Sequence, residues 1–96
     1  MLYSFSKSYY SRDDLIDILN SVTKDDALLF WMDGVLLPIK YPDLFQKIIC
    51  TQQVLKRDLD ARNIENILLQ KSPQITSISI NDCVFLTTQY FPQISY

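Results

Sequence analysis

The pattern of apolar and polar residues alternates between segments typical of strands and segments typical of helices. The most informative segment is the run of six apolar residues Ala27–Met32, which lies between two acids and an Asp-Gly pair. A short apolar run bounded by turn signals predicts a strand buried on both faces, although periodicity alone does not distinguish it from a buried helix segment. Asp33 and Gly34, the only glycine in the chain, follow the predicted strand. In open parallel sheets, functional sites gather where the strands end.

Three other segments are predicted to be strands. Met1–Ser6 alternates apolar and polar residues, and Gln52–Lys56 forms a weaker strand with only two apolar residues. In Ile75–Ile80 both alternating phases contain isoleucine, which predicts a strand buried on its two sides.

Helical spacing fills the intervals between these strands. Ser11 can cap a helix whose apolar stripe follows at i, i+3, i+4 and i+7, namely Leu15, Ile18, Leu19 and Val22. Pro38 and Pro42 limit any helix before Asp43 to a short one, and a second helical face follows there, made of Tyr41, Leu44, Phe45, Ile48 and Ile49. A third helix is predicted from Asp58 towards Leu68, and a last one from Asn81 to about Tyr90, where Pro92 prevents its continuation.

Strands and helices therefore alternate along the whole chain. This order predicts one α/β domain over residues 1–96, with a small parallel, flavodoxin-like sheet of about four strands and helices on both faces. The first and second strands are expected inside the sheet. Ninety-six residues leave no room for a second domain.

Composition excludes several classes of function. The chain has no histidine, two cysteines without a CxxC pair, and a single glycine. These counts exclude the usual zinc sites, Ser-His and Cys-His nucleophile pairs, and glycine-rich phosphate loops, so we expect no cofactor, no metal site and no catalytic residue. A net charge of −2 argues against stable binding of nucleic acid. No membrane span or signal peptide is visible, and we expect a cytoplasmic protein.

The remaining candidates are two cysteines, an acid, a basic cluster and a set of aromatic residues. Cys83 falls in the first turn of the last helix but beside Asp82, and Cys50 falls at a helix end that disfavours a thiolate. Packing explains both more simply than chemistry. Asp33 fits a turn or a helix cap. The basic residues Lys56, Arg57 and Arg62 are candidates for docking a partner, and so are the aromatic residues Tyr90, Phe91 and Tyr96.

Several short motifs, in order, resemble the TusB/DsrH family of sulfur-relay subunits, and its TusB branch above all. They are Met1-Leu2 at the start, Asp26-Ala27-Leu28-Leu29 leading to Asp33-Gly34-Val35, the stretch Arg57-Asp58-Leu59-Asp60-Ala61-Arg62, and an aromatic C-terminus at Tyr96. The family often has glycine where this chain has Asn63, and tryptophan where it has Tyr96. Asparagine also tolerates the left-handed conformation of a helix end.

The resemblance implies a DsrEFH-like fold and a structural role. TusB-like chains assemble with TusC-like and TusD-like subunits into a hetero-oligomer that relays persulfide sulfur for 2-thiolation of the wobble uridine of tRNA, and the TusD-like partner carries the sulfur. DsrH chains of the sulfur-oxidation branch carry a cysteine near the end of the first helix, where this chain has Ile18-Leu19-Asn20-Ser21-Val22. The resemblance therefore favours tRNA thiolation by a non-catalytic subunit.

Two alternatives stay open at this point. In the first, the chain itself carries sulfur on Cys83 or Cys50, as in DsrH-like sulfur trafficking. In the second, it is a small response-regulator-like or nucleotide-binding module. The absence of a glycine-rich loop and of an acidic pocket motif argues against this second alternative.

Overall fold

The computed structural model describes residues 1–96 and contains five strands, six α-helices and one short 3-10 helix, η1. The strands are β1 (Leu2–Phe5), β2 (Ala27–Phe30), β3 (Thr51–Leu55), β4 (Thr76–Ile78) and β5 (Gln93–Ser95). The helices are α1 (Arg12–Leu19), η1 (Met32–Leu36), α2 (Leu37–Lys40), α3 (Pro42–Gln46), α4 (Lys56–Arg62), α5 (Glu65–Lys71) and α6 (Ile80–Gln89).

All strands are parallel and form one sheet in the order β4-β3-β2-β1-β5. The prediction of a parallel α/β sheet with the first two strands inside it is confirmed. The sheet has five strands instead of four, because the tail Gln93–Ser95 pairs with β1. This strand is three residues long and follows Pro92, so its pattern in the sequence is too short to predict.

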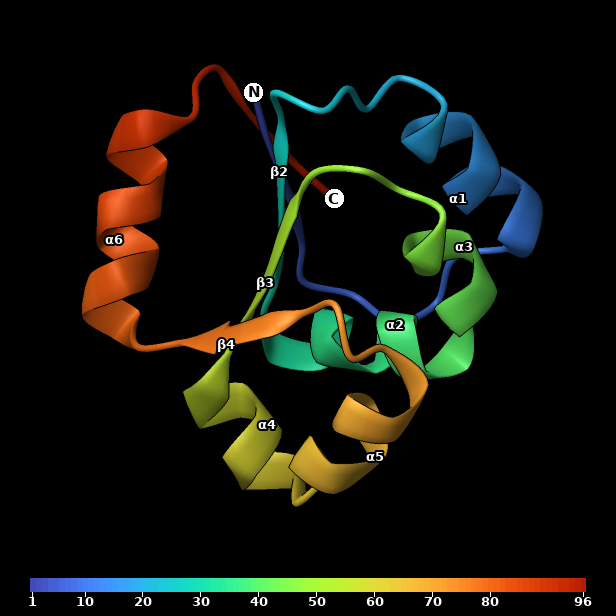
Figure 1. The fold of residues 1–96 in the computed structure, drawn as a ribbon, viewed down its shortest axis with the longest axis vertical. Coiled ribbons are helices and arrows are strands. Elements are labelled where there is room, and N and C mark those ends of the chain that lie inside the picture. The colour runs from blue at the N-terminus through green and yellow to red at the C-terminus, as the bar shows by residue number, and fades with distance from the viewer.

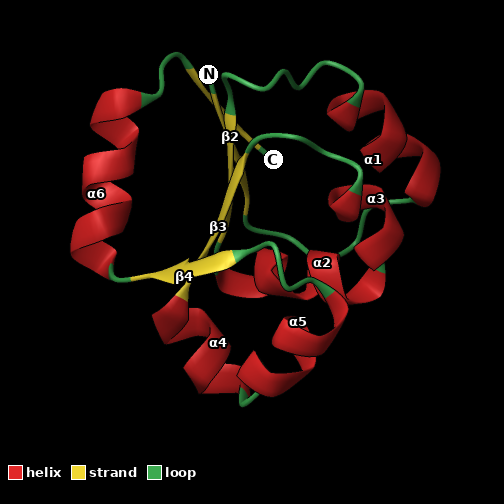
Figure 2. Ribbon diagram, viewed as in Figure 1, coloured by secondary structure: helices red, strands yellow, loops and turns green.

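The helices cover the two faces of the sheet unevenly. From β1 to β4 the chain moves one strand at a time in one direction, and α6 then carries it back to the far side of β1. Right-handed crossovers place α6 on the face opposite to the earlier helices. Figures 1 and 2 show α6 on one side of the sheet and α1, α2, α3 and α5 on the other.

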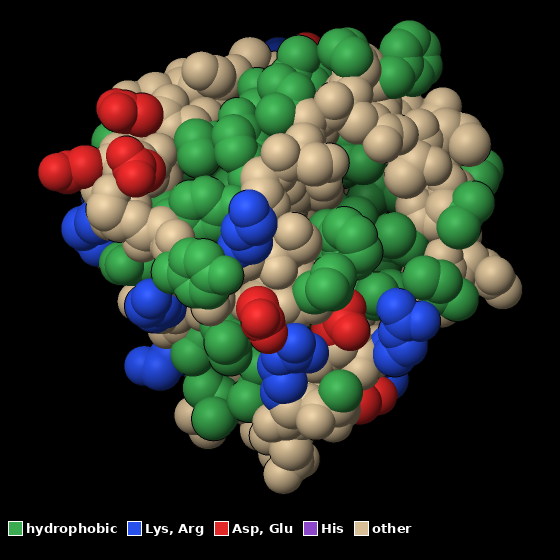
Figure 3. All heavy atoms as spheres, turned by 180° about the vertical axis from the view of Figure 1, so that it is seen from behind, with side chains coloured by type: hydrophobic (Ala, Val, Ile, Leu, Met, Phe, Trp, Pro, Cys, Tyr) green, Lys and Arg blue, Asp and Glu red, His purple; other side chains and the backbone are tan.

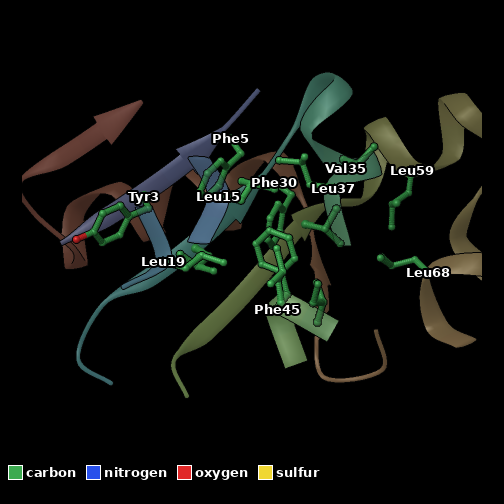
Figure 4. Close-up of a cluster of buried hydrophobic side chains, with 14 residues drawn as sticks. Tyr3, Phe5, Leu15, Leu19, Phe30, Val35, Leu37, Phe45, Leu59 and Leu68 are labelled. Carbon is green, nitrogen blue, oxygen red and sulfur yellow. The ribbon is translucent and has the colours of Figure 1, made fainter. Parts of the chain in front are cut away.

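The main core lies between the sheet and the first five helices. It contains 14 buried residues, several of them aromatic (Figure 4). Phe30 stacks on Phe5 with 5.7 Å between ring centroids and meets the edge of Phe45 at 5.0 Å. A smaller cluster of five buried residues lies under α6 and includes Leu29 and Leu86.

Strand β2 is the most deeply buried strand, with all four residues buried. The predicted strand Ala27–Met32 is two residues too long. Trp31 is half-buried, and Met32 turns into η1 with a positive φ of 52° and an exposed side chain. The ladder to β3 ends at Phe30 opposite Val54; beyond it the Trp31 amide donates to the Phe5 carbonyl, and the Trp31 carbonyl accepts from the Gly34 amide of η1.

The predicted helices are present but shorter in two places. Ser11 caps α1 by accepting from the Asp14 amide at 3.1 Å, as predicted. Helix α3 ends at Gln46, so Ile49 is exposed rather than on its buried face. The side-chain amide of Gln52 donates to the carbonyls of Phe45 and Ile48, at 2.9 and 3.0 Å, and satisfies this early helix end.

The helix predicted from Asp58 to Leu68 is divided into α4 and α5. Asn63 ends α4 in the left-handed conformation, with φ 54° and ψ 44°. The predicted fourth strand is also shorter. Thr76 and Ser77 of β4 are exposed and only Ile78 is buried, because β4 is an edge strand.

Candidate functional site

The ends of β2 and β3 bring together three charged side chains. Because the two strands are parallel neighbours, the residues that follow them meet at one edge of the sheet. Arg62 on α4 donates through Nη2 to Asp33 Oδ1 at 2.6 Å and through Nη1 to the Asp58 carbonyl at 3.0 Å. The Asp58 carboxylate accepts from the Met32 amide at 2.6 Å. These contacts connect η1 to α4.

Gly34 holds the same segment against the first strand. A Cβ atom built on Gly34 would lie 1.9 Å from the carbonyl oxygen of Phe5. Only a residue without a side chain allows this approach. The Asp-Gly pair therefore contributes two different contacts: Asp33 binds Arg62, and Gly34 packs against β1.

Asp33, Asp58 and Arg62, called the edge cluster below, connect two elements of the fold. The prediction of a turn or cap role for Asp33 missed its partner Arg62, which lies 29 positions further along the chain. The guanidinium of Arg62 is occupied by the Asp33 carboxylate and the Asp58 carbonyl, so the pair acts as a contact between η1 and α4. No local pattern predicts the pairing, which forms because Asp33 and Arg62 belong to segments that follow neighbouring strands.

The three basic candidates differ in their partners. Lys56 pairs with Asp60 at 3.2 Å and with Glu65 at 3.4 Å, and Arg62 pairs with Asp33. Arg57 is exposed and forms no ion pair. It is therefore the one basic residue of this cluster whose charge is not balanced by an acidic neighbour.

Cys83 lines a shallow groove of about 250 Å³ between α6 and the sheet, together with Arg57 and Trp31. It is half-buried and packs against the smaller cluster under α6, which includes Leu86. Burial raises the pKa of the Cys83 thiol, and the charge of Arg57 opposes this effect without reversing it. At neutral pH the residue is a thiol, whereas nucleophilic sulfur chemistry requires the thiolate.

Cys50 precedes β3 and packs against the main core. Burial raises the pKa of its thiol to about 11, and the negative charge of Asp26 adds to the shift. The two thiols are free, and the pKa of each is raised, whereas a persulfide carrier requires a lowered one.

The three aromatic candidates occupy different environments. Tyr96 stacks on Phe5 with 5.3 Å between ring centroids and is half-buried against the main core. Tyr90 is half-buried against the smaller cluster under α6. Phe91 is 72% exposed and is the one member of the set that is free to contact another protein.

Other classes of site find no support among residues 1–96. No group of three or more His, Cys, Asp or Glu side chains is arranged to hold a metal ion. None of the helices combines the length and the apolar character that crossing a membrane requires.

Comparison with known proteins adds an independent line of evidence. The family model described as DsrH-like protein matches residues 7–93. A Haemophilus influenzae sequence described as an uncharacterized protein is 46% identical over 95 residues, which cover 99% of each chain. Protein TusB of Pectobacterium parmentieri is 30% identical over 99 residues, which cover the full length of both chains. With the parallel sheet and the motifs at its edge, these matches show that the chain belongs to the DsrH-like family of sulfur-relay proteins, which includes TusB.

Proposed function

We propose that this chain is a non-catalytic subunit of a TusBCD-type sulfurtransferase complex. In this complex it assembles in the cytoplasm with TusC-like and TusD-like subunits that relay persulfide sulfur for 2-thiolation of the wobble uridine of tRNA. The full-length similarity to protein TusB is the observation that carries the proposal. The chain uses no cofactor and makes no stable contact with the tRNA.

The cysteine environments support a structural role over a sulfur-carrying one. Both thiols have a raised pKa because they are partly buried, and the charge of Arg57 beside Cys83 opposes this effect without reversing it. The edge cluster of Asp33, Asp58 and Arg62 connects two elements of the fold.

The test is a complementation experiment. A strain lacking its own TusB-type subunit receives this chain together with the TusC-like and TusD-like chains of the same genome. We expect 2-thiouridine in tRNA, measured by mass spectrometry of digested nucleosides, to return to near wild-type levels. A strain that receives only the two partner chains is the control. Absence of the modified nucleoside with all three chains expressed would contradict the proposal.

The alternative is that the chain carries sulfur itself. The position of Cys83 is the observation that supports this alternative most specifically. Cys83 is the cysteine that shares a groove with a free arginine. In that reaction the Cys83 thiolate would attack the terminal sulfur of a donor persulfide. The donor S–S bond would break, the donor would leave as a thiolate, and the new persulfide would remain on Cys83 with no net oxidation.

A double variant decides between the two functions. We expect Cys50→Ser with Cys83→Ser to support the same 2-thiouridine level as the wild-type chain in the complementation strain. Size-exclusion chromatography of the three co-expressed chains shows whether the complex still assembles. Loss of the modified nucleoside in an intact complex would favour the sulfur-carrying alternative.

A further inference from the structure

The fold leaves one face of its sheet with a single helix. Only α6 lies on this face, whereas α1, α2, α3 and α5 lie on the opposite one (Figures 1 and 2). All-parallel sheets occur almost only where both faces are covered, because their strands carry apolar residues on both sides. A five-stranded sheet is too wide for one helix to cover.

The uncovered part of this face forms the groove beside α6. The groove has a volume of about 250 Å³, and six of its eleven lining residues are apolar, among them Leu29, Trp31, Leu55, Ile80 and Cys83; Arg57 at the start of α4 is the charged one. It is smaller than the usual 300–1,000 Å³ of a small-molecule pocket. Its shape and lining therefore fit a contact with side chains of another protein better than an enclosed ligand.

The apolar surface continues from the groove over the outside of α6. Ile80 and Val84 lie one turn apart on that helix and are 48% and 60% exposed, and Phe85, which follows Val84 and is rotated about 100° from it around the helix, is 61% exposed. In Figure 3, which shows the molecule from behind, the upper right of the view, on the side of α6, carries hydrophobic and uncharged polar side chains. Contiguous exposed apolar patches on a small domain mark interaction sites.

This surface carries few charged residues, and the one that lines the groove, Arg57, is positive. From Ser79 to Tyr96 the only ionisable acid or base among Asp, Glu, Lys and Arg is Asp82. Asp82 comes two residues after Ile80 and one before Cys83, so the 100° rotation per residue places it on the other flank of α6 from the groove. Arg57 lines the groove and has no acidic partner within this chain.

We propose that the groove and the adjoining outer side of α6 are the surface on which another subunit docks. The partner presents an apolar helix with one carboxylate, which pairs with Arg57 while its apolar side chains cover Trp31, Ile80 and Val84. The inference rests on the proposed function, since the partner is a TusC-like or TusD-like chain of the same complex.

Two other occupants fit this surface less well. A nucleic acid needs several cations for its phosphates, and the surface offers Arg57 alone. A second copy of this chain would have to supply an acid to Arg57 from the same surface, where Asp82 lies on the wrong flank of α6. Self-association is therefore an outcome that the test must detect.

The test compares three variants in capture experiments with the co-expressed partner chains. Val84→Glu places a charge in the apolar surface, and Arg57→Glu reverses the unpaired charge that lines the groove. Lys47→Glu is the matched control, because Lys47 is exposed, forms no ion pair and lies after α3 on the opposite side of the sheet. Circular dichroism and thermal unfolding show whether each variant folds like the wild type.

We expect Val84→Glu and Arg57→Glu each to weaken partner binding at least tenfold, and Lys47→Glu to bind as the wild type does. If the wild-type chain binds its partners and both groove variants bind equally well, the docking surface is wrong and the proposed function stands. If the wild-type chain binds neither partner, the proposed function fails and this inference fails with it. A homodimer of the wild-type chain that Val84→Glu dissociates, without any partner binding, would also overturn it.

Discussion

At the scale of single residues, the fold depends on a few positions that admit one kind of side chain. Gly34 shows this most directly, because the carbonyl oxygen of Phe5 occupies the space of a Cβ atom. We expect Gly34→Ala to lower the free energy of unfolding by about 3 kcal/mol, since the obstacle is backbone and cannot rotate away. Urea unfolding followed by circular dichroism measures the change. A midpoint equal to that of the wild type would contradict the close approach.

The pKa of Cys50 leads to a prediction about reactivity and pH. Burial raises this pKa from its ordinary value of 9.0 to about 11, a difference of two units. In the Cys83→Ser background, we expect iodoacetamide at pH 8 to alkylate Cys50 roughly a hundredfold more slowly in the folded chain than in urea, because the thiolate is that much rarer. Mass spectrometry of timed samples gives the two rates.

The same shift makes the folded state less stable in alkali. Between pH 9 and about 11 the unfolded chain loses the Cys50 proton while the folded chain keeps it, so the free energy of unfolding falls as the pH rises through this range. Cys50→Ser removes this part of the pH dependence. In the alkylation experiment described above, equal rates in the folded and unfolded chains would show that burial does not raise the pKa of the Cys50 thiol.

At the scale of elements, Asn63 decides where α4 ends. Its φ of 54° is a conformation that glycine adopts freely, asparagine tolerates and β-branched residues resist. We expect Asn63→Gly to change the free energy of unfolding by less than about 0.5 kcal/mol and Asn63→Val to lower it by about 1–2 kcal/mol. Chemical unfolding of the two variants side by side provides the measurement. Equal destabilisation by both would mean that side-chain contacts of Asn63, rather than its backbone, matter.

Local signals in the sequence predicted the elements that depend on local chemistry. The apolar run after Asp26 predicted the buried strand β2, and Ser11 predicted the start of α1. The tolerance of Asn63 for the left-handed conformation agrees with the end of α4. What the sequence could not show are features set by tertiary pairing. Strand β5 exists because β1 offers a free edge, and Asp33 meets Arg62 because two neighbouring strands end together.

At the scale of the whole molecule, the C-terminal segment contains residues in two different environments. β5 completes the sheet beside β1, and Tyr96 follows it to stack on Phe5 in the main core. Phe91, five residues earlier, points away from this core and is largely exposed. The sequence suggested one interface for Tyr90, Phe91 and Tyr96 together. Their different burial predicts separate roles, with Tyr96 contributing to stability and Phe91 to assembly.

Alanine substitution tests this separation. We expect Tyr96→Ala to lower the free energy of unfolding by about 2 kcal/mol, since a half-buried aromatic ring loses its contacts with the core. We expect Phe91→Ala to change it by less than about 0.5 kcal/mol, because the ring is mostly in solvent. Phe91→Ala should instead weaken assembly with the partner chains about tenfold, as aromatic residues contribute disproportionately to interfaces. Chemical unfolding of each variant, and size-exclusion chromatography after co-expression, measure the two effects independently. If Phe91→Ala assembles like the wild type at every concentration, Phe91 lies outside the interface, and the docking surface is confined to the groove and the exposed side of α6.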